Sequence, residues 1–183
     1  MYYQKIVVTI LSCLFCWCLH SQQLSVEDIL LEPSDLLKEE LAAGTNAVFQ
    51  NTIGNLNTTT ISQVHEGGIE SNLIRTLQVG NSNIIDIDQR GYGNQIVVLQ
   101  EGNDNTYLLR QEGALHKSLV IQRGNSNEII QELTNGSSVT TEFIQEGDNN
   151  RIEHIVSGVN NQSFQLTQSG NGLEVIINQS GGN

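Results

Sequence analysis

Residues 83–105 have the sequence NIIDIDQRGYGNQIVVLQEGNDN, which contains one short pattern twice. Each copy begins with an asparagine (Asn83, Asn94), runs through alternating residues to a glutamine (Gln89, Gln100), and then enters a glycine-containing turn. The copies are eleven residues apart, and related copies continue along most of the chain. A short fixed period is typical of stacked structural units rather than of a globular core.

The first copy alternates in character. Its odd positions from Asn83 to Gln89 place two isoleucines between two amides, whereas its even positions hold Ile84, Asp86 and Asp88. Because successive side chains of a strand point to opposite faces, the odd positions form one inward face. A slip of one residue would turn the isoleucines outward, so this alternation determines the strand register.

Twelve such strands can be placed between Asn46 and Gln179, each followed by a turn of small and polar residues. Two units of eleven residues close one coil of about 22 residues, and six coils at roughly 4.8 Å each give a stack on the order of 29 Å tall. The only proline, Pro33, lies outside this region, as expected for a ladder that needs every N–H group. The sequence therefore predicts an all-β fold, a cross-β solenoid of about six two-strand coils.

Some units depart from the pattern. Fourteen residues separate Gln63 from Gln78, which predicts extra loop residues between two strands. Other residues occupy amide places: Leu133, Thr134 and Val156 lie at or near glutamine places, and His116 and Val139 lie at asparagine places.

Residues 1–21 have the features of a signal peptide. Lys5 precedes an apolar stretch at residues 6–19, and Ser21 is an acceptable cleavage point. The fourteen residues of this stretch are too few to span a bilayer. All three cysteines lie in this removable segment, so the mature chain is expected to have no disulfide, thiolate metal site or cysteine nucleophile.

Residues 22–45 differ from the repeat region. They contain six acids against Lys38, together with several leucines, and residues 25–28 and 34–41 predict two short helical turns. We interpret this segment as an acidic N-terminal arm before a repeat domain at residues 46–183. The formal net charge of the whole chain is −12, which argues against nucleic acid and anionic membranes as partners.

The pattern N-x-h-x-h-x-Q-x-G-x-x-N, where h is aliphatic, resembles the curlin repeat of bacterial curli fibres. Residues 83–94 and 94–105 match it nearly position for position, and the resemblance covers residues 46–183. It implies a secreted amyloid subunit that polymerises with itself, and with a second curlin-type subunit, into an extracellular fibre (a pilus or fimbrium) for adhesion and biofilm formation. It also implies periplasmic chaperones and export through an outer-membrane secretion pore. Curlins commonly have a glycine-rich targeting segment, whereas the arm is acidic and leucine-rich.

The resemblance and the stacking together suggest the candidate functional residues, because stacked amides form ladders in cross-β structure. The expected amyloid-core amides are Gln78, Gln89, Gln100, Gln111, Gln122, Gln145, Gln168, Gln179, Asn83, Asn94, Asn105, Asn127 and Asn150. The expected turn glycines are Gly80, Gly91, Gly102, Gly113, Gly124, Gly136, Gly147, Gly158, Gly170 and Gly181. No capping segment is evident after Gln179, so open strand edges are expected to drive assembly.

Other functions have less support from the sequence. No catalytic residues, phosphate loop or cofactor site stand apart from the repeat, so we expect no enzyme. His65, His116 and His154 are scattered, and we interpret them as tolerated substitutions rather than metal ligands. A minor nucleator subunit and a monomeric β-solenoid adhesin remain as alternatives. As a further hypothesis, outward acids slow premature assembly; the residues in question are Asp86, Asp88, Glu142 and Glu153.

Overall fold

The computed structural model describes residues 7–10 and 46–181, which form thirteen strands and no helix. The prediction of twelve strands in the repeat region is confirmed. These strands are β2 (Asn46–Ile53), β3 (Thr58–His65), β4 (Asn72–Val79), β5 (Ile84–Tyr92), β6 (Gln95–Glu101), β7 (Thr106–Ala114), β8 (Lys117–Arg123), β9 (Glu128–Ser137), β10 (Thr140–Glu146), β11 (Arg151–Ser157), β12 (Ser163–Ser169) and β13 (Glu174–Ser180).

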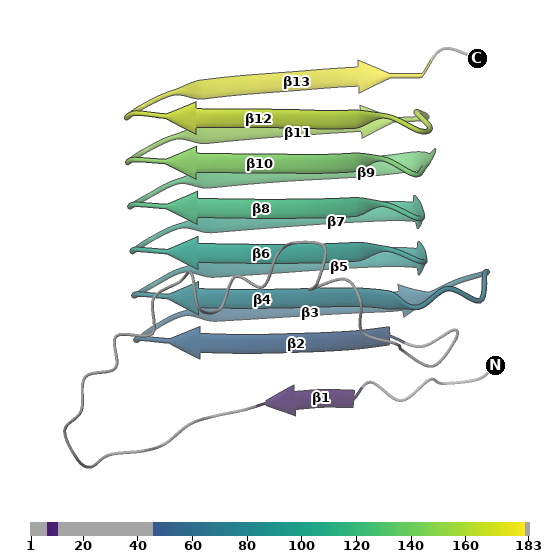
Figure 1. The fold of residues 1–183 in the computed structure, drawn as a ribbon, viewed down its shortest axis with the longest axis horizontal. Helices are drawn as coiled ribbons and strands as arrows, with labels where there is room; N and C mark the ends of the chain where they lie inside the picture. Colours follow the sequence, from purple (N-terminus) through teal and green to yellow (C-terminus); the bar gives the residue numbers. More distant parts are fainter. Residues whose placement is uncertain (1–6, 11–45, 182–183) are drawn as a thin grey trace.

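The strands form two parallel sheets, and each coil contributes one strand to each sheet (Figure 1). Sheet A has the order β1-β2-β4-β6-β8-β10-β12, and sheet B has the order β13-β11-β9-β7-β5-β3. The register places equivalent positions beside one another: Gln78 pairs with Gln100, and Gln100 pairs with Gln122. The predicted β-solenoid of about six coils is therefore present.

Strand β1 (Val7–Ile10) lies inside the segment predicted to be a signal peptide. It pairs in parallel with β2, with Val7 opposite Ala47. The rest of the predicted signal peptide and the predicted helical turns of the arm lie outside the described residues.

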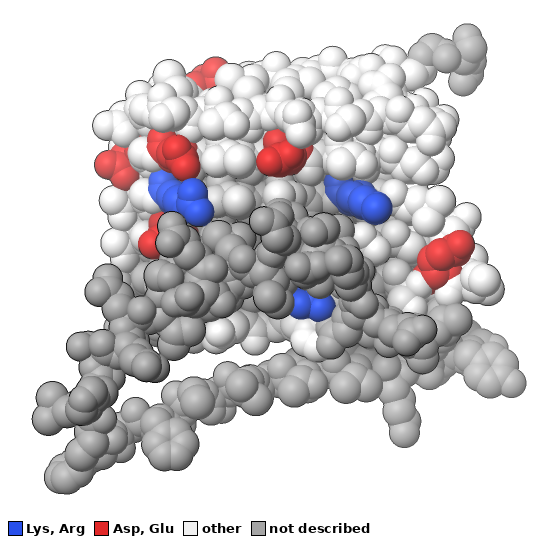
Figure 2. Space-filling view, in the orientation of Figure 1, with Lys and Arg blue, Asp and Glu red and all other residues white. Residues whose placement is uncertain are grey.

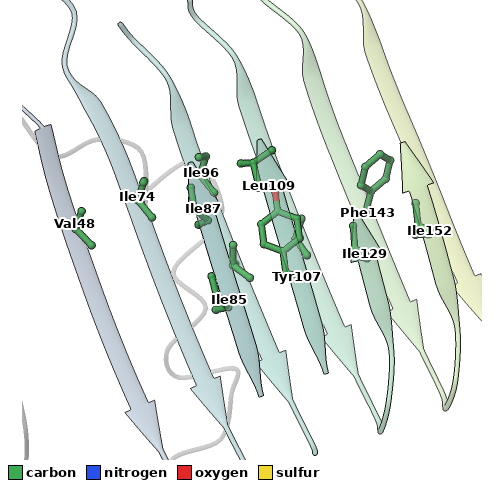
Figure 3. Close-up of a cluster of buried hydrophobic side chains, with 12 residues drawn as sticks. Val48, Ile74, Ile85, Ile87, Ile96, Tyr107, Leu109, Ile129, Phe143 and Ile152 are labelled. Atoms are coloured by element: carbon green, nitrogen blue, oxygen red, sulfur yellow. The ribbon is translucent and has the colours of Figure 1, made fainter. Parts of the chain in front are cut away.

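The interior between the sheets is apolar at its centre (Figure 3). The buried cluster contains Val48, Ile74, Ile85, Ile87, Ile96, Val98, Tyr107, Leu109, Val120, Ile129, Phe143 and Ile152. These residues come from the inward positions that the alternation predicts. Fully burying an aliphatic or aromatic side chain of this size contributes roughly 1.5–3 kcal/mol, so the centre of the stack supplies most of its hydrophobic stabilisation.

Two kinds of turn close each coil. At the A-to-B corner, sheet A strands lead into sheet B strands, as between β6 and β7; at the B-to-A corner the reverse occurs, as between β5 and β6. The predicted extra loop lies at the B-to-A corner, at residues 66–71 between β3 and β4. A register shift between Gln111 and Gly113, where β7 pairs with β9, adds a residue there as well. The irregularities thus concentrate at one corner.

Candidate functional site

The glutamines that end the sheet A strands form a continuous hydrogen-bonded ladder at the A-to-B corner. Gln78 Nε2 donates to Gln100 Oε1 at 3.0 Å, and Gln100 Nε2 donates to Gln122 Oε1 at 2.8 Å. The chain continues from Gln122 to Gln145 at 3.0 Å and from Gln145 to Gln168 at 2.8 Å. All five side chains are buried, with at most 3% exposure.

Each of these glutamines also joins the two sheets. The Nε2 atom of Gln100 donates to the carbonyl oxygen of Ile84, and that of Gln122 donates to the carbonyl oxygen of Thr106, both at 3.0 Å. Gln78, Gln145 and Gln168 make the equivalent bond to sheet B. One amide thus links neighbouring coils and facing strands, so these side chains determine both the stacking register and the closure of the corner.

The asparagines that precede the sheet B strands form a second ladder at the same corner. Asn105 receives the hydrogen bond of the Asn127 backbone N–H on its Oδ1 at 3.1 Å, and its own Nδ2 donates to Gly124 O at 2.8 Å. Asn57, Asn83, Asn127 and Asn150 make the same pair of contacts. Each asparagine therefore holds the turn of a neighbouring coil in place.

The turn glycines permit this close stacking. Of the ten predicted glycines, all but Gly136 and Gly181 have positive φ. At Gly102, where φ is +116°, an added Cβ atom would collide with the carbonyl oxygen of Gly124 in the next coil. A larger residue would therefore be opposed both by its backbone conformation and by the neighbouring turn.

A third ladder, which the sequence analysis did not identify, runs along the outside of the A-to-B turns. The backbone N–H of Asn81 donates to Asn103 Oδ1 at 3.0 Å, and that of Asn103 donates to Asn125 Oδ1 at 3.1 Å. Asn55, Asp148 and Asn171 extend the series. The signal in the sequence is the Asn or Asp that directly follows the first glycine of each turn at this corner, residue types that also favour turns.

The amides at the B-to-A corner do not form an unbroken series. Gln63 Nε2 donates to Gln89 Oε1 at 2.6 Å. Among the described residues, however, neither amide atom of Gln111 has a hydrogen-bond partner, nor does Gln89 Nε2. The places that follow Gln111 in register are held by Leu133 and Val156. These two residues form a separate apolar cluster with Val139 and Val159.

His116 lies at a position of this corner where other coils have an asparagine, and it makes some of the hydrogen bonds that the asparagine would make. Its backbone N–H donates to Asn94 Oδ1 at 3.0 Å, and its ring Nδ1 accepts a hydrogen bond from the Val139 N–H at 3.2 Å. The ring can accept this bond only when Nδ1 is unprotonated. Burial lowers the pKa of His116, which favours that neutral form.

A closed polar network lies in the middle of the stack, between the two corners. Gln131 Nε2 donates to Thr141 Oγ1 at 2.9 Å, Thr141 Oγ1 donates to Ser118 Oγ at 3.1 Å, and Ser118 Oγ donates to Gln131 Oε1 at 3.1 Å. The Tyr107 hydroxyl also donates to Gln131 Oε1, at 2.9 Å, and burial raises the pKa of Tyr107. The alternation predicted that these residues face inward, but not that they meet.

His154 is buried between two aromatic rings. Its ring centroid lies 5.1 Å from that of Phe143 and 4.7 Å from that of Phe164, both in edge-to-face geometry. Neither ring nitrogen has a hydrogen-bond partner among the described residues. Burial lowers the pKa of His154 to about 4, so the ring is neutral at pH 7.

The two ends of the stack expose strand edges. Strands β12 and β13 each have one neighbour at the C-terminal end, and β3 has one neighbour at the other end. Inward residues of the last coil, such as Val175 and Ile177, are partly exposed, whereas equivalent residues in the middle coils are buried. Gln179 Nε2 donates to Gln162 Oε1 at 3.0 Å, so amides return at the B-to-A corner in the last coil.

A shallow hollow of about 440 Å³ at the B-to-A corner is lined by Glu66, Arg90, Tyr92, Glu112 and backbone. No cluster of three or more His, Cys, Asp or Glu residues suited to a metal ion occurs in the described part of the chain, and no helix there is long and apolar enough to cross a membrane.

Several outward charged residues pair with one another. Arg151 contacts Glu128, Glu153 and Glu174, which come from three neighbouring coils. Of the four acids suggested to slow assembly, Asp86 is exposed, Asp88 and Glu142 are partly exposed, and Glu153 is engaged by Arg151. Their suggested effect on assembly stays a prediction.

Comparison with known proteins agrees with this geometry. Residues 80–113 match the family model of the Curlin associated repeat. The match covers β5, β6 and most of β7, which contain the pattern in its most regular form. Neither a curated protein nor a solved structure gave a match to the chain. The other coils continue the same inward positions in register, so the pattern that matches the Curlin associated repeat at residues 80–113 extends along the described stack.

Proposed function

We propose that this chain is an exported structural subunit of a curli-type amyloid fibre, which self-assembles on the cell surface and serves adhesion and biofilm formation. The observation that carries the proposal is the way in which the sheets end. Strands β12 and β13 at the C-terminal end and β3 at the other end each present an unpaired strand edge on which another coil can add. The curlin repeat is a structural element, and we propose no reaction for this chain.

A second copy would continue the stack in register. Extending the observed pairing places the next copy's β2 on β12 and its β3 on β13. Ile61 would then lie on Ile177, and Gln63 on Gln179, so apolar residues meet apolar residues and amides meet amides. The parallel pairing of β1 with β2 supports this geometry, because it places a parallel strand at the β2 edge.

Amyloid growth is the direct test. The chain from residue 22 onward, released from denaturant, should show a lag followed by sigmoidal thioflavin-T fluorescence, and the product should diffract at roughly 4.7 and 10 Å. Addition of preformed fibres should remove the lag. A soluble, β-rich monomer that never binds the dye would overturn the proposal and favour a monomeric β-solenoid adhesin.

A cysteine pair tests the junction itself. Ala47 and Ser163 occupy the same row of sheet A at opposite ends of the stack, so Ala47→Cys and Ser163→Cys would be adjacent only between two copies. The spacing of paired strands, about 4.8 Å, is within the range for a disulfide. Oxidised fibres should yield disulfide-linked multimers. The matched control Ala47→Cys with Ser169→Cys, at opposite ends of their strands, should not.

The role within the fibre can be tested in the same assay. A major subunit should form the bulk of the fibre, whereas a minor nucleator added in trace amounts should shorten the lag of a second curlin-type subunit. We also propose that export involves periplasmic chaperones and an outer-membrane pore. Retention of the chain in the periplasm when a curli-type pore is deleted would support this route.

A further inference from the structure

The two inner amide ladders of the A-to-B corner each lack an amide in one terminal coil. In the glutamine row, five coils supply a glutamine, and the first coil has Thr52 instead. In the asparagine row, the first five coils supply an asparagine, and the last coil has Leu173. Strand β1 pairs with β2 up to Gln50, so Thr52 lies beyond that pairing. The two exceptions are therefore at opposite ends of one subunit.

The glutamine ladder is closed within the subunit at both of its ends. At the N-terminal end, Gln78 Oε1 accepts a hydrogen bond from Thr59 Oγ1 at 2.9 Å, where an inner coil would use the preceding glutamine. At the C-terminal end, Gln168 Nε2 donates to the carbonyl oxygens of Arg151 and Leu173, at 3.0 and 3.2 Å. The last amide group therefore already has two acceptors in its own subunit and gains little from another copy.

The asparagine ladder stops at Leu173. The N–H of Leu173 donates to Asn150 Oδ1 at 3.1 Å, but the leucine side chain has no polar atom with which to repeat this contact. In a second copy stacked in register, Asn57 would lie beside Leu173. Its N–H would lack the side-chain acceptor that Asn83 N–H finds in Asn57 at 2.9 Å. The carbonyl oxygen of Gly54 in that copy would likewise lack an asparagine donor, so the junction misses two hydrogen bonds.

The outer ladder of this corner, by contrast, can continue from one copy to the next. Inside the subunit, Asn55 N–H donates to Asn81 Oδ1 at 3.0 Å, and Asp148 N–H donates to Asn171 Oδ1 at 2.8 Å. In the same register, the N–H of Asn171 would meet Oδ1 of Asn55 in the next copy. The junction thus keeps the outer ladder and the backbone pairing of the strands.

Charge contributes little at the two ends of the stack. Strands β2, β3 and β12 contain no Asp, Glu, Lys or Arg, and β13 contains Glu174 as its one such residue. Figure 2 shows the end of the stack that carries β12 and β13 with little charge, whereas acidic and basic side chains lie over the middle coils. Hydrogen bonds and packing, rather than ion pairs, therefore determine how strongly two copies hold together.

We propose that the junction between two copies is the weakest layer of the fibre, because both inner amide ladders end within each subunit. The inference rests on the proposed function, since it takes the partner at each end to be a second copy of this chain. Its consequence is that a fibre comes apart between subunits rather than within one. Such breakage releases intact stacks whose strand edges can add further copies.

The concentration of soluble chain in equilibrium with sedimented fibres measures the strength of the junction. In the chain from residue 22 onward, Leu173→Asn offers an acceptor to Asn57 and a donor to Gly54 of the next copy. The soluble concentration should therefore fall about tenfold at a fixed urea concentration. The matched control Leu173→Ala removes the leucine without adding an amide and should not lower it. The urea midpoint of the soluble monomer should change little, because no coil follows position 173 in the subunit.

Thr52→Gln tests the other ladder, because it offers a new Oε1 atom to Gln168 of the preceding copy. The expected fall in soluble concentration is about threefold, since Gln168 already has acceptors of its own. Soluble concentrations that are no lower in the two amide variants would overturn the inference while leaving the fibre in place. So would an equal fall in Leu173→Ala, because loss of the leucine would then explain it. If the unsubstituted chain forms no fibres, the proposed function fails, and this inference fails with it.

Discussion

The two corners of the solenoid hold neighbouring coils in register in different ways. At the A-to-B corner, an unbroken series of buried amides runs from Gln78 to Gln168, and every member bonds the next. At the B-to-A corner, the glutamine series is interrupted after Gln111 and resumes at Gln179, and the chain adds a loop at residues 66–71 and an extra residue opposite β7. One regular corner therefore suffices to hold the register of the whole stack.

The interrupted corner also shows how an amide ladder is replaced. The places after Gln111 and His116 become apolar together, and Leu133, Val139 and Val156 pack against one another. Consecutive apolar residues satisfy one another, so only the amides at the two boundaries of the block lose a neighbour. Gln111 is at one boundary, where its buried, unpartnered amide is energetically unfavourable.

The largest expected effect comes from glycines that lie against the next turn, which occur at both corners, for example Gly102 and Gly91. Gly102→Ala places a Cβ atom against the carbonyl oxygen of Gly124 at φ +116°, so we expect a loss of about 4 kcal/mol or failure to fold. Gly158→Ala at the B-to-A corner has its nearest neighbour atom at 3.8 Å and φ +69°, so a loss of about 1 kcal/mol is expected. Denaturant unfolding followed by circular dichroism measures both. Equal losses would contradict the idea that close contact with the neighbouring turn, rather than positive φ alone, excludes a Cβ atom at Gly102.

Glutamine substitutions compare the two ladders directly. Gln122→Leu removes the bonds to Gln100, to Gln145 and to the Thr106 carbonyl, and it should destabilise the fold by about 3 kcal/mol. Gln111→Leu replaces an amide without partners by the residue type that follows in register, so it should be neutral or stabilise by about 1 kcal/mol. The same unfolding experiment provides the values. A similar cost at both positions would mean that burial, rather than the ladder, determines the effect.

Acid should destabilise the fold through its buried histidines. The pKa of His154 is lowered to about 4 in the folded chain, against about 6.5 when unfolded. Between these values only the unfolded chain binds the proton, so stability falls as the pH drops from about 6.5 to 4, by up to about 3 kcal/mol. His154→Leu should remove most of this dependence, as measured by urea midpoints at pH 7.5 and 4.5. An unchanged slope would show that the acid sensitivity does not come from a lowered pKa of His154.

Much of the fold could be predicted from the sequence because each inward position repeats with a fixed period. The alternation around Ile85 and Ile87 determines which face is buried, and the spacing of Gln78, Gln100 and Gln122 determines the register. Contacts between different repeats were harder to predict. The network of Ser118, Gln131 and Thr141 depends on which strands face one another, and the orphaned Gln111 depends on the residue in the next coil.

Restoring an asparagine at position 116 tests how much a continuous amide ladder contributes to stability at the B-to-A corner, and it has the smallest expected effect. In His116→Asn, the new Oδ1 can accept the Val139 N–H in place of the ring Nδ1, and the new Nδ2 can reach the carbonyl oxygen of Gly136, as Asn94 does for Gly113 at 3.0 Å. We expect a gain of about 1 kcal/mol at pH 7. The gain should be larger at pH 5, because the buried histidine with its lowered pKa is lost. His116→Ala removes the acceptor without replacing it and should be destabilising. If the asparagine variant is no more stable than the alanine variant, ladder continuity contributes little at this corner, and its tolerance of irregular residues follows from packing alone.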